Sequence, residues 1–169
     1  MNASAVLITD SMALAEAVAA EVERQLALLP RQDIARASID NNGKIIVTET
    51  LQQAMDISNQ LAPEHLELCV EEPFRWLDKV QHAGSVFLGR YCPEALGDYF
   101  AGPNHTLPTM GTARFANPLS VDDFVKKYQY TYYTKDALSK VAEDIAYFAG
   151  QEGLDAHARS ATIRFEDEI

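Results

Sequence analysis

A glutamate and a histidine stand side by side in the segment LAPEHLEL, where Glu64 precedes His65. The pair follows a proline and lies between a helical pattern and the start of an expected strand. A carboxylate beside an imidazole can move protons near neutral pH, because the environment tunes the pKa of both groups. The same pair would also be ordinary on a solvent-facing loop. Acid–base chemistry and a plain loop pair are therefore the two interpretations of this segment.

A second candidate is the segment GDYFAGPNH, in which Asp98 and His105 lie seven residues apart. A carboxylate and an imidazole between glycines suit a metal ion or a polar substrate. The alternative is an aspartate that closes a local turn and a histidine on the surface.

A third candidate is EGLDAHARS, with Glu152, Asp155 and His157. On the helix expected there, Glu152 and His157 need not share a face. A single histidine near a chain end is typical of a partner for the helix dipole, which is the alternative to a ligand role. His82, in KVQHAGS, has no chemical partner nearby in the sequence and is interpreted as structural or surface-exposed.

Several common signatures are absent from the sequence: GxGxxG, GxxxxGK[ST], HExxH and GxSxG do not occur. Cys69 and Cys92 match neither a zinc-finger nor a redox spacing. The first residues, MNASAVLITD, lack the charged and apolar regions of a signal peptide. We therefore expect reduced thiols and a cytoplasmic protein.

The composition is that of a globular protein. The 169 residues are 47% hydrophobic and 23% charged. Fourteen Lys and Arg residues against 25 Asp and Glu residues give a net charge of −11, which argues against a nucleic-acid partner. No apolar run approaches the roughly 20 residues that span a bilayer, so no membrane partner is expected. Without clustered cations, the tyrosines within 128–133 are expected to pack rather than to stack on bases.

Short apolar runs alternate with amphipathic stretches over the first 90 residues. Strands are expected near 5–9, 44–48, 65–70 and 84–88. Helices are expected over 12–29, 51–62 and 73–80, with a turn at 40–43. This order predicts an α/β domain over 1–119, with a mainly parallel, Rossmann-like sheet and helices on both faces.

Prolines and glycines interrupt every pattern between residues 90 and 118. This long segment carries Tyr91, Tyr99, Phe100 and Phe115, and is expected to be ordered and packed. Residues 120–169 predict a separate helical appendage, with helices starting at Ser120, Thr134 and Gly153. Such a small helical unit cannot bury its apolar stripe alone, so we expect it to pack against a partner chain.

Three segments taken together resemble histidinol dehydrogenase: LAPEHLEL, GSVFLGRYCPEALGDYFAGPNHTLPT and EGLDAHARSATIR, in this order. The resemblance extends from Ala5 to Arg164 and is strongest over Ala62–Thr109. It implies oxidation of L-histidinol through L-histidinal to L-histidine, with NAD⁺ and a bound Zn²⁺. The substrate would be the small molecule L-histidinol.

The resemblance also implies roles for individual residues. Glu64 and His65 match the catalytic pair, in which the histidine is the general base and the glutamate activates water. Asp98 and His157 match zinc ligands. The positions that match substrate contacts are His65, Asp98, Tyr99, His105, Glu152 and His157.

The family protein is more than twice as long, and this chain matches its C-terminal part. In the family, two further zinc ligands in a Q-x-x-H segment and the NAD-binding region lie before the point where this chain begins. The resemblance therefore implies no cofactor-binding residue here and an incomplete zinc site. It also implies a homodimer in which the helical tail completes the partner's site.

Two hypotheses follow from the sequence. The first is the C-terminal portion of a zinc- and NAD-dependent histidinol dehydrogenase, inactive as this chain alone and weak in zinc binding. The alternative is a non-catalytic truncated relative that folds, dimerises and binds a small imidazole ligand or nothing.

Overall fold

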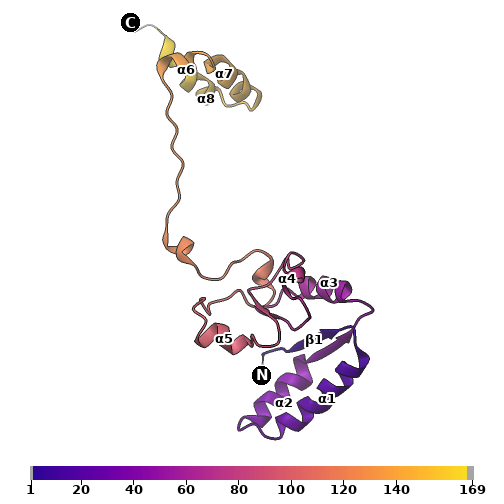
Figure 1. The fold of residues 1–169 in the computed structure, drawn as a ribbon. Coiled ribbons are helices and arrows are strands. Elements are labelled where there is room, and N and C mark those ends of the chain that lie inside the picture. The colour runs from indigo at the N-terminus through magenta and orange to yellow at the C-terminus, as the bar shows by residue number, and fades with distance from the viewer. Residues whose placement is uncertain (1, 167–169) are drawn as a thin grey trace. The chain divides into compact units, whose positions relative to one another are not determined.

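The computed structural model describes residues 2–166 and divides the chain into two compact units (Figure 1). The N-terminal unit is Met1–Val125 and the C-terminal unit is Lys126–Ile169. The boundary expected from the sequence lies slightly earlier, after residue 119. The last three residues of the expected helical appendage, 167–169, lie outside the described part.

The N-terminal unit alternates strands and helices, which confirms the α/β class. Its elements are β1 (Val6–Thr9), α1 (Met12–Leu26), α2 (Gln32–Asn42), β2 (Lys44–Val47), α3 (Leu51–Leu61), β3 (His65–Leu68), α4 (Phe74–Leu77), β4 (Ser85–Leu88), α5 (Glu94–Tyr99) and the 3₁₀ turns η1 (Thr112–Arg114) and η2 (Val121–Phe124). All four strands lie within or next to the ranges expected from the apolar runs.

The strands join in two parallel pairs. Strand β1 pairs with β2, with Val6 opposite Lys44, and β3 pairs with β4, with His65 opposite Ser85. Among the described residues no strand ladder joins the two pairs. Parallel pairing is thus confirmed, whereas a single Rossmann-like sheet is not.

Hydroxyl side chains cap the starts of two helices in the N-terminal unit. Ser11 Oγ accepts a hydrogen bond from Leu14 N at 3.2 Å, and Thr50 Oγ1 accepts one from Gln53 N at 3.2 Å. Helix α3 ends at Ala62, which is fully buried and adopts a left-handed conformation with φ of 51°. This turn delivers the chain directly to Glu64 and His65.

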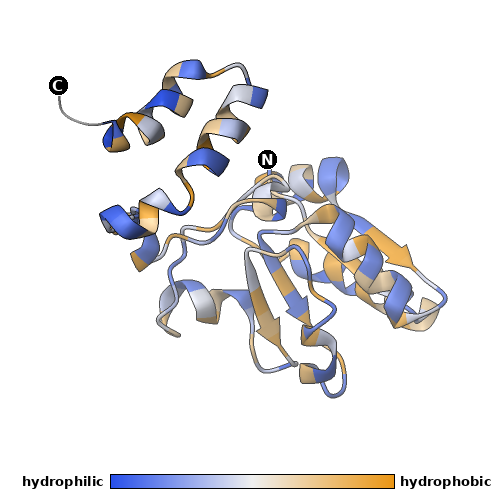
Figure 2. Ribbon diagram, turned by 90° about the horizontal axis from the view of Figure 1, so that it is seen from above, coloured by the Kyte–Doolittle hydropathy of each residue, from blue (hydrophilic) through white to orange (hydrophobic). Residues whose placement is uncertain are grey.

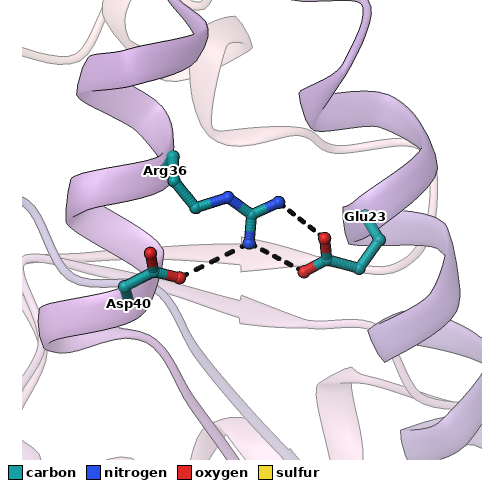
Figure 3. Close-up of polar contacts among 3 residues, drawn as sticks. All are labelled: Glu23, Arg36 and Asp40. Carbon is teal, nitrogen blue, oxygen red and sulfur yellow. Dashed lines mark hydrogen bonds and ion pairs between the residues drawn. The ribbon is translucent and has the colours of Figure 1, made fainter.

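Helix α2 corrects the expected turn at 40–43. Residues Asp40 to Asn42 form the last turn of this helix, and only Gly43 lies beyond it. Arg36 binds Glu23 of α1 through two hydrogen bonds, of 2.5 and 2.9 Å, and also contacts Asp40 at 3.4 Å (Figure 3). The turn prediction is wrong because these contacts outweigh the weak helix propensity of Asp and Asn.

Substitution Arg36→Met should lower the stability of the N-terminal unit at neutral pH. The hydrogen bond from Arg36 lowers the pKa of Glu23 below its ordinary value. A lowered carboxyl pKa stabilises the fold at neutral pH, and this contribution is lost as the pH falls through the folded-state pKa. The difference between variant and parent should therefore shrink in acid. Urea unfolding at neutral and acid pH measures this, with Arg75→Met, which breaks an exposed pair with Glu72, as the control.

The segment between residues 90 and 118 is less packed than expected. Tyr91, Tyr99, Phe100 and Phe115 are between 82% and 88% exposed. The expectation of packing is therefore wrong for this chain by itself. A segment interrupted by prolines and glycines runs over the surface of the protein, and these aromatic side chains lie there with it.

The C-terminal unit contains three short helices, α6 (Lys135–Ser139), α7 (Ala142–Gln151) and α8 (Asp155–Thr162), followed by the 3₁₀ turn η3 (Ile163–Phe165). Thr134 caps α6 as expected, by accepting from Ala137 N at 3.1 Å. The single helix expected over 134–150 is instead broken before Ala142. The helix expected from Ser120 is also wrong, since only η2 forms there, although Ser120 and Asp123 do make the expected capping box.

Apolar residues concentrate on the strands, whereas the helices carry both apolar and polar positions (Figure 2). The buried core of the N-terminal unit is small and includes Leu26, Met55, Leu68 and Phe87. Among the described residues, no helix combines the length and the apolar character needed to cross a membrane.

Candidate active site

Three ionisable side chains from two elements converge in the N-terminal unit. His65 begins β3, and Glu94 and Asp98 lie one turn apart on α5. Nε2 of His65 is 3.6 Å from Oε1 of Glu94 and 3.8 Å from Oδ1 of Asp98. One ligand atom from each residue lies within 4.8 Å of the other two. The fold thus joins the histidine of the first sequence motif to the aspartate of the second.

The backbone at Glu64 and His65 is held by the start of β4. Gly84 N donates to the carbonyl of Pro63 at 2.9 Å, and Ser85 N donates to the carbonyl of Glu64 at 2.8 Å. A Cβ atom at position 84 would lie only 2.5 Å from the Glu64 carbonyl oxygen. Only glycine permits this approach, so it fixes the point where His65 enters the strand.

Helix α5 is seated against the same two strands. Its first residue, Glu94, donates its backbone N–H to Oε1 of Glu67 on β3 at 2.8 Å. A Cβ atom at Gly97 would lie 2.7 Å from the ring of Phe87 on β4, so the helix approaches this ring closely. Phe87 is only 4% exposed, and its ring centroid is 6.0 Å from that of His65. The sheet thereby fixes the position of both acidic side chains.

The electrostatics of this cluster favour an exchange of protons or the binding of a cation. His65 Nε2 is buried and has no hydrogen-bond partner. Burial raises the pKa of Glu94 most, a hydrogen bond with Asp98 adds to the rise, and the charge of His65 opposes it. A buried polar atom without a partner costs about 1–3 kcal/mol, so this nitrogen is a natural contact for a ligand or a proton carrier.

The raised pKa of Glu94 predicts a pH-dependent effect of Glu94→Gln. The native state keeps this proton to a higher pH than the unfolded chain, so the parent loses stability as the pH rises through the native pKa. The uncharged glutamine cannot ionise. The variant should therefore gain stability relative to the parent as the pH rises from the ordinary pKa of a glutamate, about 4.3, toward neutral pH. Because the side chain is 41% exposed, solvent screening limits the gain to about 1 kcal/mol or less.

Urea unfolding across this pH range measures the effect. Glu16→Gln, on the exposed surface of α1, is the control for loss of one carboxylate. A constant difference between Glu94→Gln and the parent at every pH would contradict the prediction.

The other candidates of the N-terminal unit lie outside the group of three. Glu64 is half-buried beside His65, whereas Tyr99 and His105 are exposed. His82 donates its backbone N–H to Oδ1 of Asn59 at 3.4 Å and lines an open polar cavity of about 590 Å³. Asn59 is buried and also binds the backbone of Lys79, so this area fits the structural interpretation of His82.

The C-terminal unit brings Glu152 and His157 together. Both line an open, mainly apolar cavity of about 450 Å³ between α7 and α8, together with Val141, Asp144, Ile145, Phe148 and Ala149. The sequence left open whether these two residues share a face. Asp155 does not line this cavity. The third motif thus offers one carboxylate and one imidazole to the same space.

Glu94 is the site residue that the sequence analysis missed. The signal was the four-residue spacing of Glu94 and Asp98, which places two carboxylates on one side of a helix. It was not used because the segment 90–118 was expected to lack regular structure.

Known proteins resemble this chain along almost its whole length. A sequence model of the histidinol dehydrogenase family matches residues 1–165. Histidinol dehydrogenases from Bacillus cereus and Halalkalibacterium halodurans are each 58% identical over 167 residues, which is 99% of this chain and 39% of the relative. The crystal structure of histidinol dehydrogenase from Elizabethkingia anophelis superposes with a TM-score of 0.88 at 36% identity, over 96% of this chain and 37% of that one.

Proposed function

Because this chain belongs to the histidinol dehydrogenase family, we propose that it supplies the acid–base pair and two zinc ligands of an enzyme that oxidises L-histidinol to L-histidine. The observation that supports this most is the convergence of His65 and Asp98, with a buried and unpartnered His65 nitrogen. The chain spans 39% of the length of its relatives, so the complete activity requires further residues.

His65 acts as the general base. In each oxidation His65 takes the proton of the alcohol or of the aldehyde hydrate, and a bound NAD⁺ would accept the hydride from the C–H bond that breaks. Glu64, the residue directly before β3, activates the water that hydrates the aldehyde. The close approach of Gly84 to the Glu64 carbonyl supports this role, because it fixes the backbone from which both side chains project.

Asp98 and His157 are the zinc ligands that this chain supplies. A carboxylate and an imidazole are ligands that zinc accepts. Asp98 lies in the group with His65 and Glu94, and His157 lines the open cavity of the C-terminal unit. A zinc ion held by these residues would supply a Lewis acid for the alcohol oxygen. Glu152 shares the cavity of His157 and complements the ammonium group of the substrate, while Tyr99 and His105 complete the substrate contacts.

The remaining features of the enzyme come from outside this chain. We assign no NAD-binding residue to it, and we expect the 169 residues by themselves to bind zinc weakly and to show no turnover. The tail, including its exposed tyrosines, is proposed to pack against a second copy in a homodimer. Free Cys69 and Cys92 support a reducing compartment such as the cytoplasm.

A chimeric enzyme tests the function directly. Residues 1–165 replace the matching segment of the Bacillus cereus relative, which supplies the rest of the protein. The chimera should reduce NAD⁺ with L-histidinol at a rate comparable to that of the relative, whereas the isolated chain should not. A folded, zinc-loaded chimera without turnover would refute the proposal.

The alternative is a non-catalytic relative that binds a small imidazole compound. Two observations support it: the match covers only 39% of the length of the relatives, and an open cavity is lined by Glu152 and His157. Calorimetry of the isolated chain with L-histidinol distinguishes the two, because tight binding without added zinc favours the alternative.

A further inference from the structure

We propose that Glu67 is a positioning residue that holds α5, and with it Asp98, against the strand that carries His65. This inference rests on the proposed function, in which His65 is the base and Asp98 binds zinc. Neither the family resemblance nor the reading of the three sequence motifs assigns any role to Glu67.

The side chain of Glu67 supplies the hydrogen bond at which α5 begins. Its Oε1 accepts from the backbone N–H of Glu94, the first residue of this helix, at 2.8 Å. This distance is typical of a charge-assisted bond between a carboxylate and a helix N–H. Pro93, the residue before the helix, has a hydrocarbon side chain that cannot accept such a bond. The cap of α5 is therefore supplied by a residue 27 positions earlier in the chain.

Glu67 is one of two residues that hold α5 on the β3–β4 strand pair. His65 and Glu67 are two positions apart on β3, so their side chains project from the same face. Phe87 of β4 is opposite Glu67 in the strand register. Its buried ring lies 2.7 Å from the place of a Cβ atom at Gly97, the fourth residue of the helix. Glu67 and Phe87 thus contact the first and the fourth residue of α5.

Two points of contact fix the direction of a helix this short. The contact with Phe87 alone leaves α5 free to turn about that ring. The hydrogen bond at Glu94 adds a second fixed point one turn away and so sets the helix axis. Asp98 lies in the same helix, and its Oδ1 is 3.8 Å from Nε2 of His65. Glu67 therefore sets the distance between the proposed zinc ligand and the proposed base through the backbone of α5.

NMR of the 169-residue chain tests this attachment directly. In Glu67→Ala, the backbone amide of Glu94 should lose protection from hydrogen exchange, and the nuclear Overhauser contacts between the His65 ring and α5 should weaken. Glu67→Gln should restore both, because the amide oxygen still accepts a hydrogen bond. Glu71→Ala removes an exposed carboxylate just after β3 and should change neither. Unchanged protection of Glu94, or unchanged contacts at the His65 ring, in Glu67→Ala would overturn the proposal.

The zinc affinity of the chimeric enzyme tests the consequence for the site. A residue that holds a metal ligand in place typically contributes about 10–100-fold to metal affinity. Glu67→Ala should therefore raise the Kd for zinc, measured by competition with a coloured chelator, by about 10–100-fold. Glu67→Gln should recover most of this loss. An unchanged Kd in Glu67→Ala would contradict the positioning role.

Arg36→Met is the control for a general loss of stability. It removes the contact between α1 and α2, away from α5, and should leave the Kd for zinc unchanged. An equal rise of the Kd in this variant would show that zinc affinity only follows stability, and would overturn the proposal. A folded, zinc-loaded parent chimera without turnover would instead refute the proposed function, while the NMR comparison would still decide whether Glu67 holds α5.

Discussion

Turnover by the chimeric enzyme should fall by about 10²–10⁴-fold when His65 is replaced by alanine. The proposed base, His65, lies where β3 begins, and the side chains that contact its Nε2, Glu94 and Asp98, are acidic residues of α5. Neither replaces an imidazole, because a carboxylate is a weaker base at neutral pH. The loss should appear in kcat, measured from the absorbance of NADH, with a smaller effect on KM.

The matched control is His82→Ala. The described hydrogen bond of His82 uses its backbone N–H, which the substitution keeps. This variant should retain the turnover of the parent chimera. The zinc content and circular dichroism of both variants separate lost chemistry from lost structure. Equal losses in the two variants would show that His65 is no more catalytic than His82.

The largest effect on stability is expected from Phe87→Ala, which should destabilise the N-terminal unit by about 3–5 kcal/mol. Phe87 is 4% exposed and is the most deeply buried aromatic side chain among the described residues. Its ring packs on Gly97, so its removal leaves a cavity under α5 that the helix fills only in part. A domain stable by about 5–15 kcal/mol would lose a large share of its stability.

Denaturant unfolding measures this loss, with Phe74→Ala as the control. Phe74 is 74% exposed on α4, and its replacement should change the free energy of unfolding by about 0.5 kcal/mol or less. If Phe87→Ala does not fold, Phe87→Leu should still fold and cost less than about 1.5 kcal/mol. If Phe74→Ala and Phe87→Ala lowered the free energy of unfolding equally, the contact between Phe87 and α5 would not be important for stability.

The sequence was sufficient where structure depends on neighbouring residues. The apolar runs located β1 to β4, and Thr134 was correctly expected to start a helix. Both features depend on contacts within a few positions. The pairing of strands was predicted as parallel, but its division into two separate pairs depends on contacts between distant segments.

The parts that were missed depend on such distant contacts. Helix α5 is six residues long in a segment rich in proline and glycine. It forms where Glu67 accepts a hydrogen bond from its first residue and Phe87 packs against Gly97. His65 and Asp98 could be identified as candidate site residues from their residue types and from the resemblance of their segments to a family. Glu94 could not, because its importance appears only when α5 is folded against β3. The exposure of Phe100 and Phe115 could not be predicted either, because the sequence does not show which other segments pack against these side chains.

The close approach of Gly84 to the Glu64 carbonyl also has a genetic consequence. Every amino-acid substitution of this glycine adds a Cβ atom 2.5 Å from a backbone oxygen, so we expect no substitution to be tolerated at this position. Gly150 on α7 has no atom within 4 Å of such a Cβ, and its codon is free to drift toward alanine. In a saturation library of the chimera selected for growth without histidine, position 84 should keep its codon family while position 150 diversifies. The backbone that carries Glu64 and His65 thus depends in part on a residue that has no side chain.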